Sequence, residues 1–310
     1  MPMVRRRLRF AQVKSDQLQS LSRALIFLGL ILMSTVVASV VGEFAGQIVF
    51  GKSTLLMPGA TPEGEGMWWQ LHFSNFFSQA IGFGGAVFIA RALWNGSVPV
   101  GLKMTPRSLG PSALLLILLM VLVTGPFMAA SYELNVLAIP EGSVLEQMFK
   151  PMEEMLERLT SFLVEADGAR RIVVILSVAL LPAVFEELAF RGALQPLLIR
   201  ATGNPWVGIV LASIIFSAIH FQFYGFLPRV LLGMLFGWLA HRSGSILPGM
   251  VAHFLNNAGA AITLWITGSM TEDVFPLEWW TVLLSLGLTV GAVWAYDRLL
   301  KPDFRWFRAN

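Results

Sequence analysis

The sequence predicts an all-α, polytopic membrane protein in which about eight transmembrane helices form one bundle. The 310 residues are 55% hydrophobic and only 13% charged, with a mean hydropathy of +0.68. Soluble domains carry about 25% charged residues, so this composition is typical of a membrane protein. In addition, Glu186, Glu187 and Arg191 lie inside an apolar stretch. Ionisable side chains are costly within a bilayer and usually mark a functional site there.

Eight apolar windows approach the ~20 residues that a helix needs to cross a bilayer. The window at 228–241 is short and depends on its neighbours for a place in the bundle. The window at 24–42 is too long and uniform for a cleavable signal peptide, so we expect a retained anchor. The windows lie at about 24–42, 76–94, 111–130, 172–199, 206–222, 228–241, 246–266 and 279–297.

Eight spans place both termini on one side of the membrane, and the charges indicate which side. Basic residues concentrate in the tail 1–23, the loop 91–110 and the tail 298–310, whereas most acidic residues fall in the opposite loops. The positive-inside rule therefore predicts cytoplasmic termini. Without an organelle signal, a bacterial cytoplasmic (inner) membrane is the expected location.

The same charges indicate which partners to expect. The basic residues flank the predicted spans instead of forming a stripe, so nucleic acid is not an expected partner. The lipid bilayer is an expected partner. The sequence does not indicate an oligomeric state.

The stretch 143–166 between the third and fourth spans is not apolar throughout, but its hydrophobic residues recur every three or four positions. This spacing predicts an amphipathic helix, broken or kinked near Pro151, on the non-cytoplasmic surface. It is either a solvated connector or a lid over a substrate entrance. The apolar positions are Leu145, Met148, Met152, Met155, Leu159 and Leu163.

These observations divide the chain into four parts. Residues 1–23 form a basic cytoplasmic tail, and 24–170 contain the first three spans with the amphipathic helix. Residues 171–266 form the core that carries the ionisable side chains. Residues 267–310 contain the last span and a second basic tail.

The two adjacent glutamates are expected to have different partners. Glu187 and Arg191 are four residues apart on a helix, so they share a face and can form an ion pair. Glu186 points about 100° away and is free to face another helix. Alternatively, both glutamates serve only to neutralise Arg191. One arginine needs only one carboxylate for this, so the second carboxylate would be left over.

Two later apolar windows add further polar groups. His220 ends the segment Phe216–His220, and His253 and Asn257 are four apart and share a helix face. Each alone is typical of packing or of contacts between helices. Together, Glu186, His220, His253 and Asn257 offer a base for water, a second proton-handling group and donors for an oxyanion. Amide hydrolysis by water requires these groups.

The motifs resemble those of the CAAX-protease and bacteriocin-processing (CPBP) family, which includes the type II CAAX prenyl endopeptidases. They are Glu-Glu-x-x-x-Arg at 186–191, Phe-x-x-x-His at 216–220 and His-x-x-x-Asn at 253–257, and the resemblance covers roughly 172–260. It implies that Glu186 activates water with help from His220. It further implies that His253 and Asn257 stabilise the oxyanion and that Glu187 and Arg191 orient the site.

Metal dependence stays open at this point. One Glu and two His match a catalytic zinc ligand set, in which case Glu186, His220 and His253 would bind the ion. No His-Glu-x-x-His helix is present, and Asn257 is a poor zinc ligand. We therefore favour a metal-independent glutamate mechanism without cofactor, with zinc as the alternative. The chain has no cysteine, which excludes a thiolate nucleophile or a thiolate metal site.

The sequence thus predicts an intramembrane endopeptidase that cleaves a peptide or a membrane-protein segment. Two other functions compete with it. One is a non-catalytic membrane scaffold or bacteriocin-immunity-type protein that uses the same helices to bind a partner. The other is a proton-coupled carrier in which Glu186 and His220 relay protons. The substrate and its cleavage site are not specified by any motif.

Overall fold

The computed structural model describes residues 2–54, 61–94, 104, 106–268 and 278–300, and every regular element among them is helical. This confirms the predicted all-α class. The elements are α1 (Pro2–Phe50), α2 (Glu65–Phe77), η1 (Ser78–Phe83), α3 (Gly84–Leu93), η2 (Pro106–Leu109), α4 (Pro111–Val123), α5 (Gly125–Leu137), α6 (Val144–Val164), α7 (Arg170–Val174), η3 (Ile175–Leu180), α8 (Leu181–Ala189), η4 (Phe190–Leu194), α9 (Gln195–Thr202), α10 (Pro205–Ala218), α11 (Phe226–Ser243), α12 (Leu247–Thr267) and α13 (Trp279–Leu299).

Several of these elements join into longer runs. Helices α2, η1 and α3 form one run over Glu65–Leu93, and α7 to α9 form another over Arg170–Thr202. Among the described residues, four helical runs are long and apolar enough to cross a membrane, or five if one bent pair counts as a span. Each predicted window falls largely on helix, but the count of eight spans is not confirmed. The helix at Pro205–Ala218, for example, is apolar but short.

The bent pair is the window expected at 111–130. Helices α4 and α5 meet at Thr124 with a bend of 42°. The break has a local cause, because Gly125 and Pro126 follow Thr124 and proline removes a backbone N–H from the helical ladder. The sequence window did not reveal this bend, because Gly-Pro leaves the hydropathy of the stretch high.

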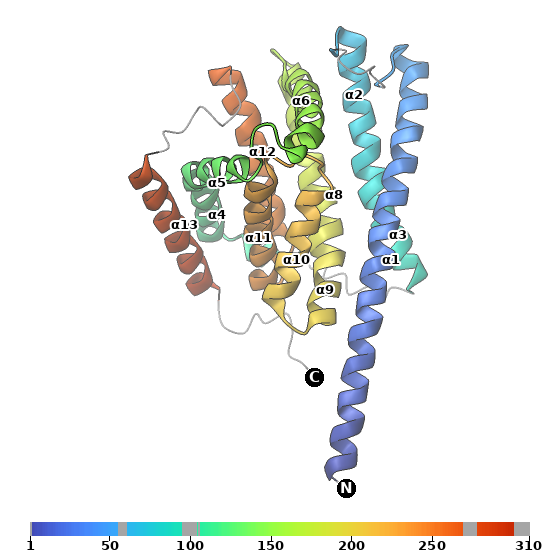
Figure 1. Ribbon diagram of the computed structural model, residues 1–310, viewed down its shortest axis with the longest axis vertical. Coiled ribbons are helices and arrows are strands. Elements are labelled where there is room, and N and C mark those ends of the chain that lie inside the picture. The colour runs from blue at the N-terminus through green and yellow to red at the C-terminus, as the bar shows by residue number, and fades with distance from the viewer. Residues whose placement is uncertain (1, 55–60, 95–103, 105, 269–277, 301–310) are drawn as a thin grey trace.

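The helices lie side by side along the long axis of the molecule (Figure 1). Helix α1 packs on α2 and α3, and its N-terminal part projects beyond the bundle, whereas α13 is the outermost helix on the opposite side. Helix α1 begins and α13 ends at the same end of the molecule, and α6 lies at the other end. Lys103, Glu272 and Lys301, on which part of the predicted orientation depends, lie outside the described residues.

Apolar side chains lie both inside and outside the bundle. Phe27, Phe190 and Leu194 are fully buried in one core cluster. By contrast, Met33 and Ile48 on α1 are 69% and 86% exposed. A helix that is hydrophobic on its outer face is typical of a membrane span. The apolar helices therefore indicate a membrane-embedded protein.

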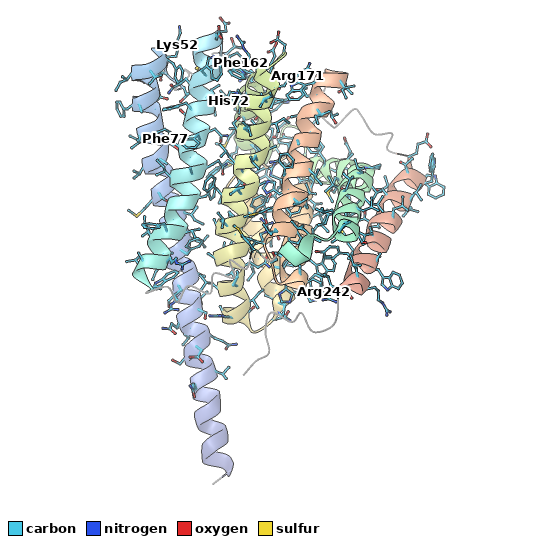
Figure 2. The ribbon with its side chains drawn as sticks, turned by 180° about the vertical axis from the view of Figure 1, so that it is seen from behind. Lys52, His72, Phe77, Phe162, Arg171 and Arg242 are labelled. Atoms are coloured by element: carbon cyan, nitrogen blue, oxygen red, sulfur yellow. The ribbon has the colours of Figure 1, made fainter. Side chains whose placement is uncertain are left out.

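Helix α6 is fixed at its C-terminal end. The last carbonyls of a helix have no intrahelical partner. Here the indole Nε1 of Trp265 donates to the Val164 carbonyl at 2.8 Å, and that of Trp68 donates to the Glu165 carbonyl at 3.1 Å. His72 Nε2 lies 3.1 Å from the carbonyl of Leu163. Figure 2 shows His72 and Phe162 at this end of the bundle, far from Arg242.

The N-terminal half of α6 is less covered. It starts at a Ser143 cap, whose side chain accepts from the Glu146 N–H, and it continues through Pro151 as one helix. Met148 and Met152 are 62% and 40% exposed. A helix therefore runs over this stretch without a break at Pro151, and its exposed apolar side chains lie away from the anchored end. The predicted amphipathic helix on the membrane surface is not confirmed.

Candidate active site

The two glutamates lie on α8, a short helix between two π-helical segments. Segment η3 precedes it and η4 follows it. Wide π-turns are frequent at functional sites, where they shift the side chains that follow around the helix. Glu186 is 5% exposed and Glu187 is fully buried. Both carboxylates are thus held inside the bundle, on the run that the sequence placed at 172–199.

Glu187 belongs to a closed ion-pair group. Its Oε1 atom lies 2.7 Å from Arg191 Nη1 and 3.1 Å from His253 Nδ1. Arg191 Nη2 donates to the carbonyl of Gly233 on α11 at 2.9 Å. The predicted Glu187–Arg191 pair is therefore present, and it extends to α11 and α12. A side chain at Gly249 would place its Cβ only 2.9 Å from Glu187 Oε2, so the helices are in close contact here.

Aromatic rings complete this closed group. The Arg191 guanidinium lies 4.8 Å from the centroid of the Phe216 ring and 5.7 Å from that of Phe236. Phe236 also stacks on His253, with ring centroids 5.2 Å apart. These contacts place the cation over two ring faces, where the aromatic quadrupole attracts it. They also fix the plane of the His253 imidazole.

Glu186 has a more open environment. Its Oε1 atom accepts a hydrogen bond from Gln79 Nε2 at 2.8 Å. Its Oε2 atom is buried and has no hydrogen-bond partner within the described part of the chain. The His253 Nε2 atom lies 4.0 Å from this Oε2 atom. Such a gap between two polar atoms is wide enough for a bridging water.

His220 lies just beyond the end of α10, in a strained turn. Its Nδ1 atom is 2.8 Å from the carbonyl of Phe216. A carbonyl can only accept, so Nδ1 carries the proton and Nε2 has a free lone pair in the neutral imidazole. The next residue, Phe221, has φ +56°, which is rare for a bulky side chain. Such strain is often found at functional sites.

Asn257 lies one turn after His253 on α12. Its Nδ2 atom donates to the Val178 carbonyl on η3 at 3.3 Å, and its Oδ1 accepts from Asn256 Nδ2 at the same distance. The Asn257 side chain is therefore positioned by η3, the segment that precedes the two glutamates. One N–H of its amide is left for another acceptor.

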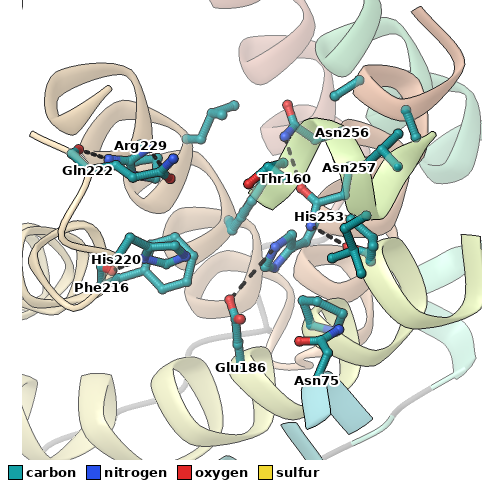
Figure 3. A pocket seen from close by; sticks show the side chains of 18 residues that line it. Asn75, Thr160, Glu186, Phe216, His220, Gln222, Arg229, His253, Asn256 and Asn257 are labelled. Atoms are coloured by element: carbon teal, nitrogen blue, oxygen red, sulfur yellow. Dashed lines mark hydrogen bonds and ion pairs between the residues drawn. The ribbon is translucent and has the colours of Figure 1, made fainter. Parts of the chain in front are cut away.

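Glu186, His220, His253 and Asn257 all line one cavity of about 390 Å³ (Figure 3). They come from three separate parts of the chain, and α6 covers one side of the cavity with Thr160, Leu163 and Val164. Glu187 and Arg191 do not line it. The other lining residues are Asn75, Val178, Pro182, Phe216, Gln222, Arg229, Leu232, Phe236, Asn256, Ala260 and Ala261.

Sequence reasoning missed two polar residues of this site. Gln79, the hydrogen-bond partner of Glu186, lies in the apolar window at 76–94, and Arg229 lies in the window at 228–241. A polar side chain inside a predicted span was the signal in both cases. Neither residue belongs to one of the three sequence motifs that identified the other residues of the site.

The zinc alternative would need three ligand side chains placed around one point. No group of three or more His, Cys, Asp or Glu side chains among the described residues is placed to hold a metal ion. We therefore derive no step through a metal ion.

The fold and the cavity define a class: a helical membrane protein with an internal acid–base site. The comparisons with known proteins narrow this class. Residues 168–259 match the family model described as type II CAAX prenyl endopeptidase Rce1-like. The match confirms the predicted resemblance to the CPBP family over the segment that carries all three motifs. No curated protein and no solved structure matches the chain with significance.

Proposed function

We propose that this protein is an intramembrane endopeptidase that uses Glu186 to activate water, without a metal ion. The observation that carries the proposal is that Glu186, His220, His253 and Asn257 line the same cavity. A non-catalytic scaffold has no physical need for these four groups around one enclosed space, and the family match does not favour it.

In the first step, a water lies between Glu186 Oε2 and His253 Nε2, which are 4.0 Å apart. Glu186 takes a proton from this water as its oxygen attacks the carbonyl carbon of the scissile peptide bond. Gln79 holds the other carboxylate oxygen at 2.8 Å, so Oε2 is aimed at the water. His220, with its free Nε2 lone pair, assists as a second proton-handling group.

In the second step, the attack turns the peptide carbonyl into an oxyanion. The Asn257 amide and a protonated His253 Nε2 supply N–H donors to it, as an oxyanion hole does. The intermediate collapses when the C–N bond breaks and the proton taken by Glu186 moves to the leaving amine. Atoms and charges balance, because water adds OH to the acyl product and H to the amine.

Glu187 and Arg191 act in this proposal as positioning residues. Glu187 Oε1 accepts from His253 Nδ1, which turns Nε2 of the same ring towards Glu186. Arg191 neutralises Glu187, so that this ion pair itself adds little net charge next to Glu186. The substrate would be a peptide or membrane-protein segment, and we further propose an inner-membrane location with cytoplasmic termini.

The test is cleavage of a library of quenched fluorogenic peptides by the purified protein in detergent. Wild type, Glu186→Gln and the matched control Glu141→Gln, an exposed glutamate in the turn before α6, are compared with and without a strong chelator. We expect cleavage by wild type and by the control, with and without chelator, and none by Glu186→Gln.

Two results would contradict the proposal in different ways. Cleavage retained by Glu186→Gln would remove the assigned base. Cleavage lost under chelator, and restored by added zinc, would replace the metal-independent mechanism by a metal-dependent one. Thermal unfolding of each variant, followed by tryptophan fluorescence, tells loss of chemistry from loss of fold.

A further inference from the structure

Arg229 lines the same cavity as Glu186, but the proposed mechanism does not use it. It lies in the first turn of α11, and its side chain is half-buried. Its Nη1 atom is 3.4 Å from Gln222 Oε1, and its Nη2 atom donates to the Gln222 carbonyl. Its Nε atom is buried and has no partner within the described part of the chain.

The charge of Arg229 is incompletely neutralised. Glu153 on α6 is the carboxylate that acts on it electrostatically, but no ion pair joins the two in the described residues. Glu153 Oε2 is itself buried without a partner there. Burial raises the pKa of Glu153, although the Tyr224 N–H and Arg229 oppose the shift, so Glu153 is a weak counter-ion.

An incompletely paired cation is costly to bury and is better explained by a ligand than by stability. Among the described residues that line the cavity, Arg229 is the one with a permanent positive charge. Gln222 accepts hydrogen bonds from two N–H groups of Arg229, one on Nη1 and one on Nη2. The N–H donors on the Nε edge of the guanidinium remain available to a ligand. This edge forms the fork that binds the two oxygens of a carboxylate.

The position of Arg229 connects it with the proposed chemistry. Both Glu186 and Arg229 act electrostatically on His220. In the view of Figure 3, His220 lies between Arg229 and Glu186. A volume of about 390 Å³ is within the range of pockets that hold small-molecule ligands, so it accommodates a short peptide segment. A segment whose peptide bond lies at Glu186 then extends past His220 to Arg229.

We propose that Arg229 binds a carboxylate of the peptide substrate and thereby selects and positions the segment that is cleaved. This inference rests on the proposed endopeptidase function. The carboxylate has two possible sources of the same chemistry: the C-terminal carboxylate of a substrate cut near its end, or the side chain of Asp or Glu. Arg229 is in either case a specificity-determining residue and not part of the acid–base machinery.

The experiment uses the fluorogenic peptides in matched pairs. One set has either a free C-terminal carboxylate or a C-terminal amide, and a second, amidated set has Glu or Gln at one position. We expect wild type to cleave the carboxylate members of one set about 10- to 100-fold faster in kcat/KM, as for a hydrogen bond to a charged group. The set that shows the preference identifies the source of the carboxylate.

The variants then assign the preference to its residue. Arg229→Gln is expected to abolish the carboxylate preference, so that the ratio of kcat/KM within each pair falls to about 1, whereas Arg229→Lys retains part of the preference. A preference unchanged in Arg229→Gln would overturn the proposal. A parallel fall for acidic and neutral peptides would also overturn it, because it would indicate only a structural role.

A binding measurement separates failure of this inference from failure of the proposed function. Peptides of each pair compete for Glu186→Gln protein against a labelled peptide, with and without Arg229→Gln. If wild type cleaves no peptide, the endopeptidase proposal fails, but the binding ratio still decides the role of Arg229. A carboxylate preference that disappears with Arg229→Gln supports it, and equal binding of both pair members overturns it.

Discussion

Glu186 and Glu187 are neighbours in the sequence, but they occupy two different environments. Glu187 faces a closed group: its Oε1 atom bonds to the cation Arg191 and to His253, and its Oε2 atom is packed against Gly249, away from the cavity and without a hydrogen-bond partner in the described residues. Glu186 faces a cavity, accepts one hydrogen bond from Gln79 and has a second oxygen without a partner in the described residues. Residues of the closed group should therefore determine stability, whereas residues of the open cavity should determine activity.

The largest effect is expected at the open cavity. Removal of a general base costs about 10²- to 10⁴-fold in rate. Glu186→Gln should therefore lower kcat by this factor, while the free energy of unfolding stays the same or rises, because an incompletely paired buried carboxylate is lost. The measurement is peptide cleavage alongside unfolding in detergent. A fall in the free energy of unfolding as large as the rise in the activation free energy would show that Glu186 belongs with the closed group.

The converse change is at Arg191. Breaking a buried ion pair by removing one partner costs about 3–5 kcal/mol, because the other charge is left uncompensated. Arg191→Met should lower the free energy of unfolding by this amount, as measured by equilibrium unfolding in detergent. The double variant Glu187→Gln with Arg191→Met should recover part of the loss. If the double variant is as unstable as the single one, packing of the arginine and not its charge is the cause.

A smaller effect is expected at Gln79, which joins α2–α3 to the open cavity. Its hydrogen bond to Glu186 is one to a charged group, worth about 1.5–3 kcal/mol, so Gln79→Leu should lower kcat about tenfold to a hundredfold. KM should change little, and the free energy of unfolding should fall by no more than about the same 1.5–3 kcal/mol. As a control, Asn75→Leu removes a polar side chain that lines the cavity but donates its hydrogen bond to the Ser177 carbonyl and not to Glu186. An equal fall in kcat there would show that Gln79 has no special role.

The two glutamate environments also show which parts of the structure could be predicted from the sequence. The Glu187–Arg191 pair follows from spacing alone, because residues four apart share a helix face. The convergence of the three motifs was expected from the chemistry of their side chains and from the family resemblance, because spacing does not relate residues on separate helices. Gln79 could not be assigned to Glu186, because the two are 107 residues apart and the contact depends on how α2–α3 packs against α8. The bend at Thr124 was also missed, since a hydropathy window does not register the lost N–H of Pro126.

The smallest effect concerns the turn that holds His220 at the cavity. A positive φ costs a non-glycine residue roughly 1–2 kcal/mol, but glycine loses about 0.5–1 kcal/mol more chain entropy on folding. Phe221 has φ +56° and is 55% exposed, so Phe221→Gly should raise the free energy of unfolding by less than about 1 kcal/mol. Cleavage should fall, because a relaxed turn holds His220 and Gln222 less firmly. Phe221→Ala keeps the strained backbone and loses only the ring, so its stability should not rise; an equal gain in both variants would assign the effect to the side chain and not to backbone strain.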